Sequence, residues 1–182
     1  MIVLIGSSGS GKSTIEKILV DEHGFEKVIS YTTRLPREGE QDGREYHFVP
    51  YKEFLCMVEA NYFIEYVQYG EHFYGTSEES IGYNKAIVIE SGGLKQLIVN
   101  EVTPLYVCVI VAPENDRVER MRGRGDSAED ILRRMKLDDE LFRDITKYAH
   151  CIIFNNHDTP ELLQLREAIA ELVKEYRSLY EE

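Results

Sequence analysis

The chain has 182 residues, of which 43% are hydrophobic and 30% charged, and this size and composition suit one globular domain with a buried core. The formal net charge of −12 argues against general nucleic-acid binding, and because no apolar stretch approaches the length of a membrane span, a membrane partner is not expected. The three cysteines, at positions 56, 108 and 151, have neither the spacing of a zinc site nor the even number of a disulfide framework.

The chain begins with a predicted buried strand that runs directly into a phosphate-binding loop. Residues 2–5 are apolar, the pattern G-x-x-x-x-G-K-S follows over residues 6–13, and a helical pattern comes next. The glycines let successive backbone N–H groups face one polyphosphate, Lys12 reaches its β- and γ-phosphates, and the Ser13 hydroxyl can ligate Mg²⁺. The residues predicted to hold the phosphates of a nucleotide, with ATP favoured, are Gly6, Ser7, Ser8, Gly9, Ser10, Gly11, Lys12, Ser13 and Thr14.

The helix after this loop is expected to end near Gly24, and a second strand is expected over residues 27–30. Residues 31–75 are typical of a small β-rich lobe inserted into an α/β frame, because short strand patterns alternate with prolines, glycines and charge. Its predicted elements are a strand at 46–48, a helix over 51–60 and a hairpin over 62–74 that turns at Gly70, and a helix that starts at Ser77 is expected after it.

The rest of the chain alternates strands with helices, which predicts a parallel sheet covered on both faces, with ligands at the carboxyl ends of its strands. The predicted elements are strands at 86–89, 105–111 and 151–154, and helices around 94–98, over 114–122, over 127–147 and after a cap at Thr159-Pro160. The last helix has an apolar stripe that is expected to pack on this sheet, with a coiled-coil seam as the alternative: Leu162, Leu165, Ile169, Leu172, Tyr176 and Leu179.

Residues 30–48 contain a second stretch with chemical information. Arg34 and Arg37 are three residues apart, with Pro36 between them and hydroxyl side chains before them. Two guanidinium groups held in this way offer planar forks for a single phosphate monoester. A solvated basic loop is the alternative interpretation.

The segment Thr-Thr-Arg-x-Pro-Arg-x-Gly-Glu at residues 32–40, together with the phosphate-binding loop, resembles the guanylate kinases, which phosphorylate GMP with ATP. The resemblance covers nearly the whole chain and implies a P-loop kinase fold in a single domain, residues 1–182. The implied parts are a parallel-sheet core at about 1–30, 85–120 and 148–182, a GMP-binding lobe at about 31–84 and a helical lid at about 121–147. It also implies ATP and Mg²⁺, GMP or dGMP as acceptor, and a monomer or homodimer. A cytoplasmic location is expected because the N-terminus begins a strand and not a signal peptide.

The resemblance also implies roles for residues of the acceptor site. Ser30, Tyr46 and Tyr74 correspond to residues around the GMP phosphate, which Arg34 and Arg37 would hold. Glu65 corresponds to the acid that reads guanine, and Thr76 to a residue at the guanine O6 edge. A carboxylate can accept from guanine N1–H and N2–H₂ together, an arrangement of donors that adenine lacks.

Residues 117–136 hold seven of the chain's 21 Lys and Arg residues, and some of them resemble lid arginines that fold over the donor triphosphate. The resemblance assigns this role to Arg120, Arg124 and Arg134, whereas a basic, salt-bridged helix is the alternative. Asn155 matches a residue near the adenine end of the donor, and a turn after the strand at 151–154 is its alternative. The predicted catalytic groups are Lys12, Arg34, Arg37, Arg124 and Arg134.

The sequence departs from the family pattern after the central strand. Family members usually carry Asp-x-Asp-x-Gln-Gly there, and this chain has Val88-Ile89-Glu90-Ser91-Gly92-Gly93. Glu90 keeps an acid that can serve the guanine or the water shell of Mg²⁺, whereas Val88 removes the first acid. If that acid helps to organise Mg²⁺ and the lid, either turnover is low or another acid substitutes for it.

Three other functions are considered. A same-fold kinase of another phosphorylated acceptor, such as ribose 1,5-bisphosphate, would have no use for Glu65 and Thr76. A non-catalytic guanylate-kinase-like binding module typically loses the loop lysine, which is present here as Lys12. A GTPase switch would need an Asn-Lys-x-Asp motif, and Asn84-Lys85 lacks its aspartate.

Overall fold

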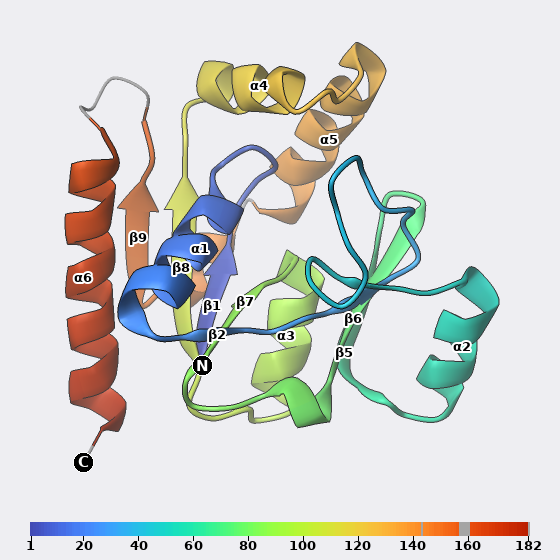
Figure 1. Ribbon diagram of the computed structural model, residues 1–182, viewed down its shortest axis with the longest axis horizontal. Helices are drawn as coiled ribbons and strands as arrows, with labels where there is room; N and C mark the ends of the chain where they lie inside the picture. Colours follow the sequence, from blue (N-terminus) through green and yellow to red (C-terminus); the bar gives the residue numbers. More distant parts are fainter. Residues whose placement is uncertain (143, 157–160, 182) are drawn as a thin grey trace.

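A five-stranded parallel sheet forms the centre of the computed structural model, which describes residues 1–142, 144–156 and 161–181. Figure 1 shows this sheet with the N-terminus at its centre and helix α6 along one side. The strands, in spatial order, are β2 (Glu26–Lys27), β7 (Lys85–Val88), β1 (Ile2–Ile5), β8 (Tyr106–Val111) and β9 (Cys151–Phe154). The predicted parallel sheet is confirmed.

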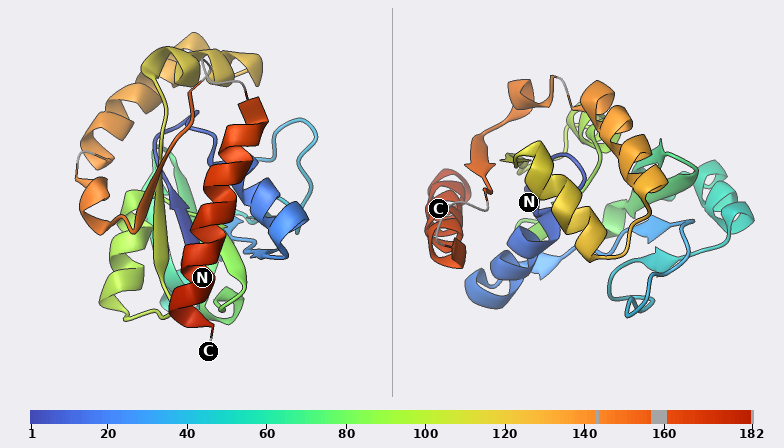
Figure 2. Two further views of the ribbon diagram at one scale, coloured as in Figure 1. Left: turned by 90° about the vertical axis from the view of Figure 1, so that its left-hand side faces the viewer. Right: turned by 90° about the horizontal axis from the view of Figure 1, so that it is seen from above.

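Both faces of this sheet are covered, as a continuously apolar central strand requires. Ile2 and Leu4 of β1 pack toward α1 (Lys12–His23) and α6 (Glu161–Tyr180), while Val3 and Ile5 pack toward α3 (Ser91–Val99) and the 3₁₀ turn η2 (Ile145–Tyr148). In the left view of Figure 2, α6 lies lengthwise along its face of the sheet. Because β1 runs parallel to its two neighbours, the loop that follows it leaves the sheet at the carboxyl ends of the strands.

A second, four-stranded sheet lies beside the first and carries helix α2 (Tyr51–Glu59) (Figure 1). Phe54 of α2 is fully buried, and its ring stacks on that of Phe63 with a centroid distance of 4.6 Å. The strands, in spatial order, are β4 (His47–Phe48), β3 (Tyr31–Thr32), β6 (His72–Ser77) and β5 (Phe63–Tyr69). The predicted hairpin is β5–β6, and Gly70 in its turn has a φ of 63°.

Helices α4 (Glu114–Gly123) and α5 (Ala128–Leu141) lie over the carboxyl ends of β1 and β8. The view from above in Figure 2 shows this pair crossing from the first sheet toward the second. Ser127 caps α5, because its side-chain oxygen accepts a hydrogen bond from the backbone N–H of Asp130 (3.1 Å). None of the helices in the described parts of the chain is long and apolar enough to cross a membrane.

The structure corrects three boundaries. The helix predicted to start at Ser77 is wrong: Ser77 pairs with Phe63 in the sheet, which keeps its backbone extended, and only a 3₁₀ turn, η1 (Glu78–Ser80), follows. The helix predicted over 127–147 ends at Leu141. The strand predicted over 27–30 covers Glu26–Lys27 alone.

The stripe on the last helix packs against its own sheet, as predicted, and not as a coiled-coil seam. Ile169, Leu172 and Tyr176 are buried in the core with α1, and Leu165 packs against them, but Leu179 is exposed. The predicted cap at Thr159-Pro160 lies outside the described residues, and so does the side chain of Leu162.

Candidate functional site

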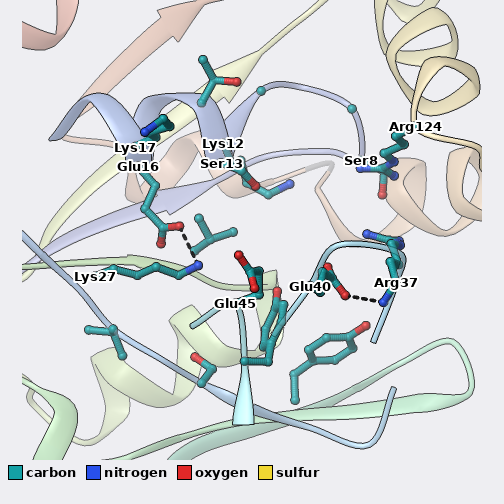
Figure 3. A pocket seen from close by; sticks show the side chains of 18 of the residues that line it. Ser8, Lys12, Ser13, Glu16, Lys17, Lys27, Arg37, Glu40, Glu45 and Arg124 are labelled. Carbon is teal, nitrogen blue, oxygen red and sulfur yellow. Dashed lines mark hydrogen bonds and ion pairs between the residues drawn. The ribbon is translucent and has the colours of Figure 1, made fainter. Parts of the chain in front are cut away.

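One cleft of about 740 Å³ opens between the first sheet, the second sheet and the α4–α5 pair. Figure 3 shows Lys12 and Ser13 at the start of α1 on one side of it and Arg37 and Glu40 on another. A smaller cavity of about 30 Å³ shares Ser30 and several neighbouring residues with it. The predicted site residues that line the two cavities are Ser8, Gly9, Gly11, Lys12, Ser13, Thr14, Ser30, Arg34, Arg37, Tyr46, Glu65, Tyr74, Glu90, Arg120, Arg124 and Arg134.

The loop between β1 and α1 wraps closely enough to need its glycines. Gly9 has a φ of 76°, and a Cβ there would lie 2.5 Å from the backbone oxygen of Arg117. Gly11 has a φ of 99° and caps α1, so the N-terminus of that helix faces the cleft. A Cβ on Gly11 would lie 2.1 Å from the Asn155 side-chain nitrogen. The loop has the backbone form that an anion site requires.

Lys12 is folded over this loop, with its ammonium group donating to the backbone oxygens of Gly6 and Ser7 (3.1 Å to Ser7). Burial lowers the pKa of Lys12, and the carboxylates of Glu90 and Asp138 oppose that shift. Glu90 is the N-cap residue of α3, two positions after the end of β7, where burial raises its carboxyl pKa and the nearby Lys12 charge opposes the rise. The acid that the sequence retains at position 90 thus faces the loop lysine, and Val88 lines the same cleft.

Arg34 is held by a carboxylate in the fork geometry that a phosphate would also fit. Its two terminal nitrogens donate to the two carboxylate oxygens of Glu40 at 2.8 and 2.9 Å, and its side chain is buried. The guanidinium lies over the rings of Tyr46 (5.5 Å) and Phe48 (5.7 Å). The same Glu40 accepts the backbone N–H of Arg37 (2.7 Å), so one acid fixes the segment that carries both arginines (Figure 3).

Among the described residues, six arginines line the cleft: Arg34, Arg37, Arg44, Arg120, Arg124 and Arg134. Burial lowers the pKa of Arg37, and the positive charges of Arg34, Arg124 and Arg134 lower it further. Asp126 lies between two of them, because it accepts from Arg124 (2.6 and 2.8 Å) and is 3.8 Å from Arg37. The chain therefore concentrates cationic charge here in spite of its net charge of −12.

Arg134 and Arg120 differ in what they contact. Arg134 lies over the ring of Tyr69 (5.8 Å), and its buried Nε has no hydrogen-bond partner among the described residues. Arg120 instead donates to backbone oxygens of Gly9 (3.2 Å) and Asn155 (3.1 Å). Asn155 in turn donates to the Ser10 oxygen (2.8 Å). Arg120 and Asn155 thus brace the loop, a contact that the sequence did not predict.

Glu65 lies at the bottom of the smaller cavity and is 3% exposed. Its carboxylate accepts a hydrogen bond of 2.5 Å from Thr76, whose hydroxyl is 3.1 Å from that of Ser30. Burial raises the pKa of Glu65 to about 7. The structure therefore brings together the two residues that the resemblance assigns to the guanine, Glu65 and Thr76, and joins to them Ser30, which it assigns to the surroundings of the GMP phosphate.

Sequence reasoning missed several charged residues of this region. Arg117 and Asp138 form a buried ion pair (2.8 Å) against the loop, and Glu16 pairs with Lys27 (3.4 Å) at the α1 side of the cleft (Figure 3). Arg117 belongs to the basic stretch at residues 117–136, but nothing in the sequence pairs it with Asp138 on the next helix. Arg117 differs from the basic residues around it because it is buried and its partner, Asp138, is buried as well.

Comparison with known proteins gives consistent results. The family model described as guanylate kinase matches residues 1–172. A guanylate kinase of Caldanaerobacter subterraneus is 35% identical over 166 residues, which cover 87% of this chain and 81% of that protein. The guanylate kinase of Schizosaccharomyces pombe is 38% identical over 146 residues, covering 74% and 71%. The crystal structure of guanylate kinase from Anaplasma phagocytophilum superimposes with a TM-score of 0.68 at 20% identity, covering 96% and 84%, which shows the same fold.

Proposed function

The chain belongs to the guanylate kinase family, and we propose that its cleft transfers the γ-phosphoryl group of ATP to GMP with the help of Mg²⁺. This proposal rests on the residues that line the cleft. The phosphate-binding loop, the Arg34–Arg37 segment and the arginines of the α4–α5 pair all line the same space. Two phosphate-bearing ligands can meet there end to end. The smaller cavity with Glu65 continues from the acceptor side of that space.

The reaction that these groups support is a direct displacement. An oxygen of the GMP phosphate forms a bond to the γ-phosphorus, and the bond from that phosphorus to the β–γ bridging oxygen breaks. ADP leaves with the electron pair, and GDP is the second product. Because a phosphate oxygen is already nucleophilic, positioning and charge neutralisation account for most of the catalysis.

In this scheme the donor is held by the loop amides and Lys12, and the acceptor phosphate by Arg34 and Arg37. Mg²⁺, when bound, supplies charge neutralisation at the β- and γ-phosphate oxygens. Ser13 is the residue that would hold it, since its exposed hydroxyl lines the cleft at the start of α1. The described residues contain no group of three or more His, Cys, Asp or Glu that could hold a metal ion. Because Mg²⁺ usually keeps several waters, water and phosphate oxygens would supply its other ligands.

We assign the remaining steps to the segment 121–147, the lid, and to residues 31–84, the acceptor lobe. Arg124 and Arg134 would neutralise the transferring group once the lid closes, and closure would exclude water from it. Arg124 would then exchange Asp126 for phosphate. Glu65 and Thr76 would select guanine over adenine, because their hydrogen-bonded pair offers acceptors to the guanine edge. All of these groups come from one chain, so a monomer or a homodimer can work, and the cytoplasm is the proposed location.

The alternative acceptors and the non-catalytic module are less favoured. A ribose bisphosphate has no purine edge for the buried Glu65–Thr76 pair, and it would offer the Glu65 carboxylate none of the N–H donors of guanine. A non-catalytic binding module does not require a loop lysine. This chain has one, Lys12, and the carboxylates of Glu90 and Asp138 favour its charged form. The curated relatives named above are also guanylate kinases.

The test is a coupled ADP-release assay with ATP, Mg²⁺ and a panel of acceptors: GMP, dGMP, AMP, UMP and ribose 1,5-bisphosphate. Turnover is expected with GMP, and substitution of Lys12 by alanine should abolish it, because the loop then lacks its cation for the β- and γ-phosphates. Turnover with another acceptor of the panel but none with GMP would refute the assignment.

A further inference from the structure

Four segments that are distant in the sequence meet at the carboxylate of Asp138. This residue lies in the C-terminal half of α5, is 1% exposed, and has no role in the proposed reaction scheme. Its two oxygens accept hydrogen bonds from the Ser8 backbone N–H (2.7 Å), Arg117 (2.8 Å) and the Tyr69 hydroxyl (2.9 Å). We call Ser8, Tyr69, Arg117 and Asp138 the Asp138 junction.

The junction fixes one residue of the phosphate-binding loop from both sides. Asp138 accepts the Ser8 N–H, while Arg117 Nε donates to the Ser8 carbonyl oxygen (2.9 Å), and the two side chains are paired with each other. A buried ion pair is tolerated only when its remaining hydrogen-bonding capacity is used, and this pair uses it on the loop backbone. The conformation of the loop at Ser8 is therefore set by α4 and α5 as well as by β1 and α1.

The Tyr69 hydroxyl connects the same carboxylate to the acceptor lobe. Tyr69 is the last residue of β5 and is 7% exposed, and its oxygen is also 3.1 Å from the Ser8 hydroxyl. The face of its ring carries the guanidinium of Arg134 at 5.8 Å. Asp138 thus holds in place the surface on which a proposed lid arginine rests.

The charge of Asp138 also acts on the donor side. Its carboxylate and that of Glu90 are the two acids that favour the charged form of Lys12 against the effect of burial. Asp138 is a buried residue of α5 that accepts hydrogen bonds from three groups of the protein, and it does not line the cleft. Its influence on bound nucleotide would be indirect.

We propose that Asp138 is a positioning residue for phosphoryl transfer, which aligns the donor loop with Arg134 and with the acceptor lobe. This inference rests on the proposed function. Each nucleotide would still bind to its own half of the cleft without Asp138, but the reacting phosphates would lose their alignment. The loss would then fall on kcat and only slightly on KM.

The test compares Asp138→Asn and Tyr69→Phe with two matched controls. The controls are Asp139→Asn, at the exposed next residue of α5, and Tyr66→Phe, at a half-exposed position of β5. We expect Asp138→Asn to lower kcat about 10- to 100-fold, as a misalignment of about 1 Å would do, with KM for ATP and GMP changed less than about threefold. Tyr69→Phe removes one hydroxyl and keeps the ion pair, so it folds and lowers kcat less. The controls should match the wild type.

Two further readouts separate positioning from simple stability. Thermal unfolding measures the folded fraction, so kcat is expressed per folded molecule. ATP hydrolysis without GMP should fall less than transfer does, because water needs no alignment with the acceptor lobe. Wild-type kcat per folded molecule in both variants, or a rise in KM alone, would overturn the role of Asp138. Absence of GMP turnover in the wild type would overturn the proposed function and this role together.

Discussion

At the level of single residues, Glu65 has an environment unlike that of an exposed carboxyl group. It is 3% exposed, and burial favours its uncharged form and raises its pKa to about 7, although the hydrogen bond from the neutral Thr76 hydroxyl opposes the rise. Guanine would bring two further donors, which favour the charged form. Binding of GMP should therefore compete with protonation of Glu65 near neutral pH.

This competition predicts a pH dependence of GMP affinity. Because the raised pKa is about 7, the carboxylate is lost as the pH falls through 7, and KM for GMP should rise about tenfold between pH 8 and pH 6. Glu65→Gln should raise KM for GMP at every pH and remove this step, leaving only the titration of the GMP phosphate. Steady-state kinetics between pH 6 and pH 8 measure the KM for GMP of both proteins. Glu59→Gln, at the exposed end of α2, is the control.

A KM for GMP that has the same pH profile in Glu65→Gln as in the wild type would contradict the assignment. The Glu65 carboxyl would then have no part in reading the base.

At the level of elements, helix α3 sets the position of the acceptor lobe against the first sheet. Gln96 donates to the backbone oxygen of Tyr66 (2.7 Å) and accepts its N–H (3.1 Å), so a side chain of α3 satisfies the free edge of β5. In the first turn of α3, a Cβ on Gly93 would lie 2.3 Å from a carboxylate oxygen of Glu65. The glycine permits the helix to approach Glu65 this closely.

The close approach predicts that Gly93→Ala acts on the acceptor and not on the donor. The added methyl group must displace the Glu65 carboxylate, so KM for GMP should rise about 10- to 100-fold while KM for ATP stays the same. Initial-rate measurements with each substrate varied in turn give both constants. Gly82→Ala is the control, because its Cβ would meet only the flexible Lys85 side chain, at 3.3 Å. Equal changes in both KM values would contradict the prediction.

For the whole molecule, the cleft is the place where charged residues from three parts of the chain meet. These parts are the phosphate-binding loop with α1, the acceptor lobe and the α4–α5 pair. Arg37, Arg124 and Arg134 repel one another there, and Asp126 offsets only part of that charge. Two nucleotides would bring enough negative charge to remove the repulsion. Binding of both should therefore draw the lid and the acceptor lobe together.

This closure predicts a smaller radius of gyration when GMP and a non-hydrolysable ATP analogue are bound together with Mg²⁺. Small-angle X-ray scattering measures it, with each nucleotide alone giving a smaller change than the pair. Lys12→Ala provides the control, because it weakens donor binding and should shift the change to higher concentrations of the analogue. An unchanged radius at saturation with both ligands would exclude closure of this kind.

The sequence predicted those features whose signals are local. Hydrophobic periodicity predicted the α/β class, the parallel sheet and the order of the strands and helices that form it. The observed fold confirms these features. The phosphate-binding loop was recognisable because glycine, lysine and serine must stand at fixed spacings to surround a phosphate. Arg34 and Arg37 were identified in the same way, and the structure places both in the cleft.

Tertiary structure alone decided the features that depend on contacts between distant residues. Ser77 is extended because it pairs with Phe63, although its local sequence favours the start of a helix. The burial that raises the pKa of Glu65 comes from α3 and β6, which the periodicity of β5 does not reveal. Asp138 lies 130 positions from Ser8, and no sequence pattern links residues so far apart; only the packing of α5 on the loop joins them.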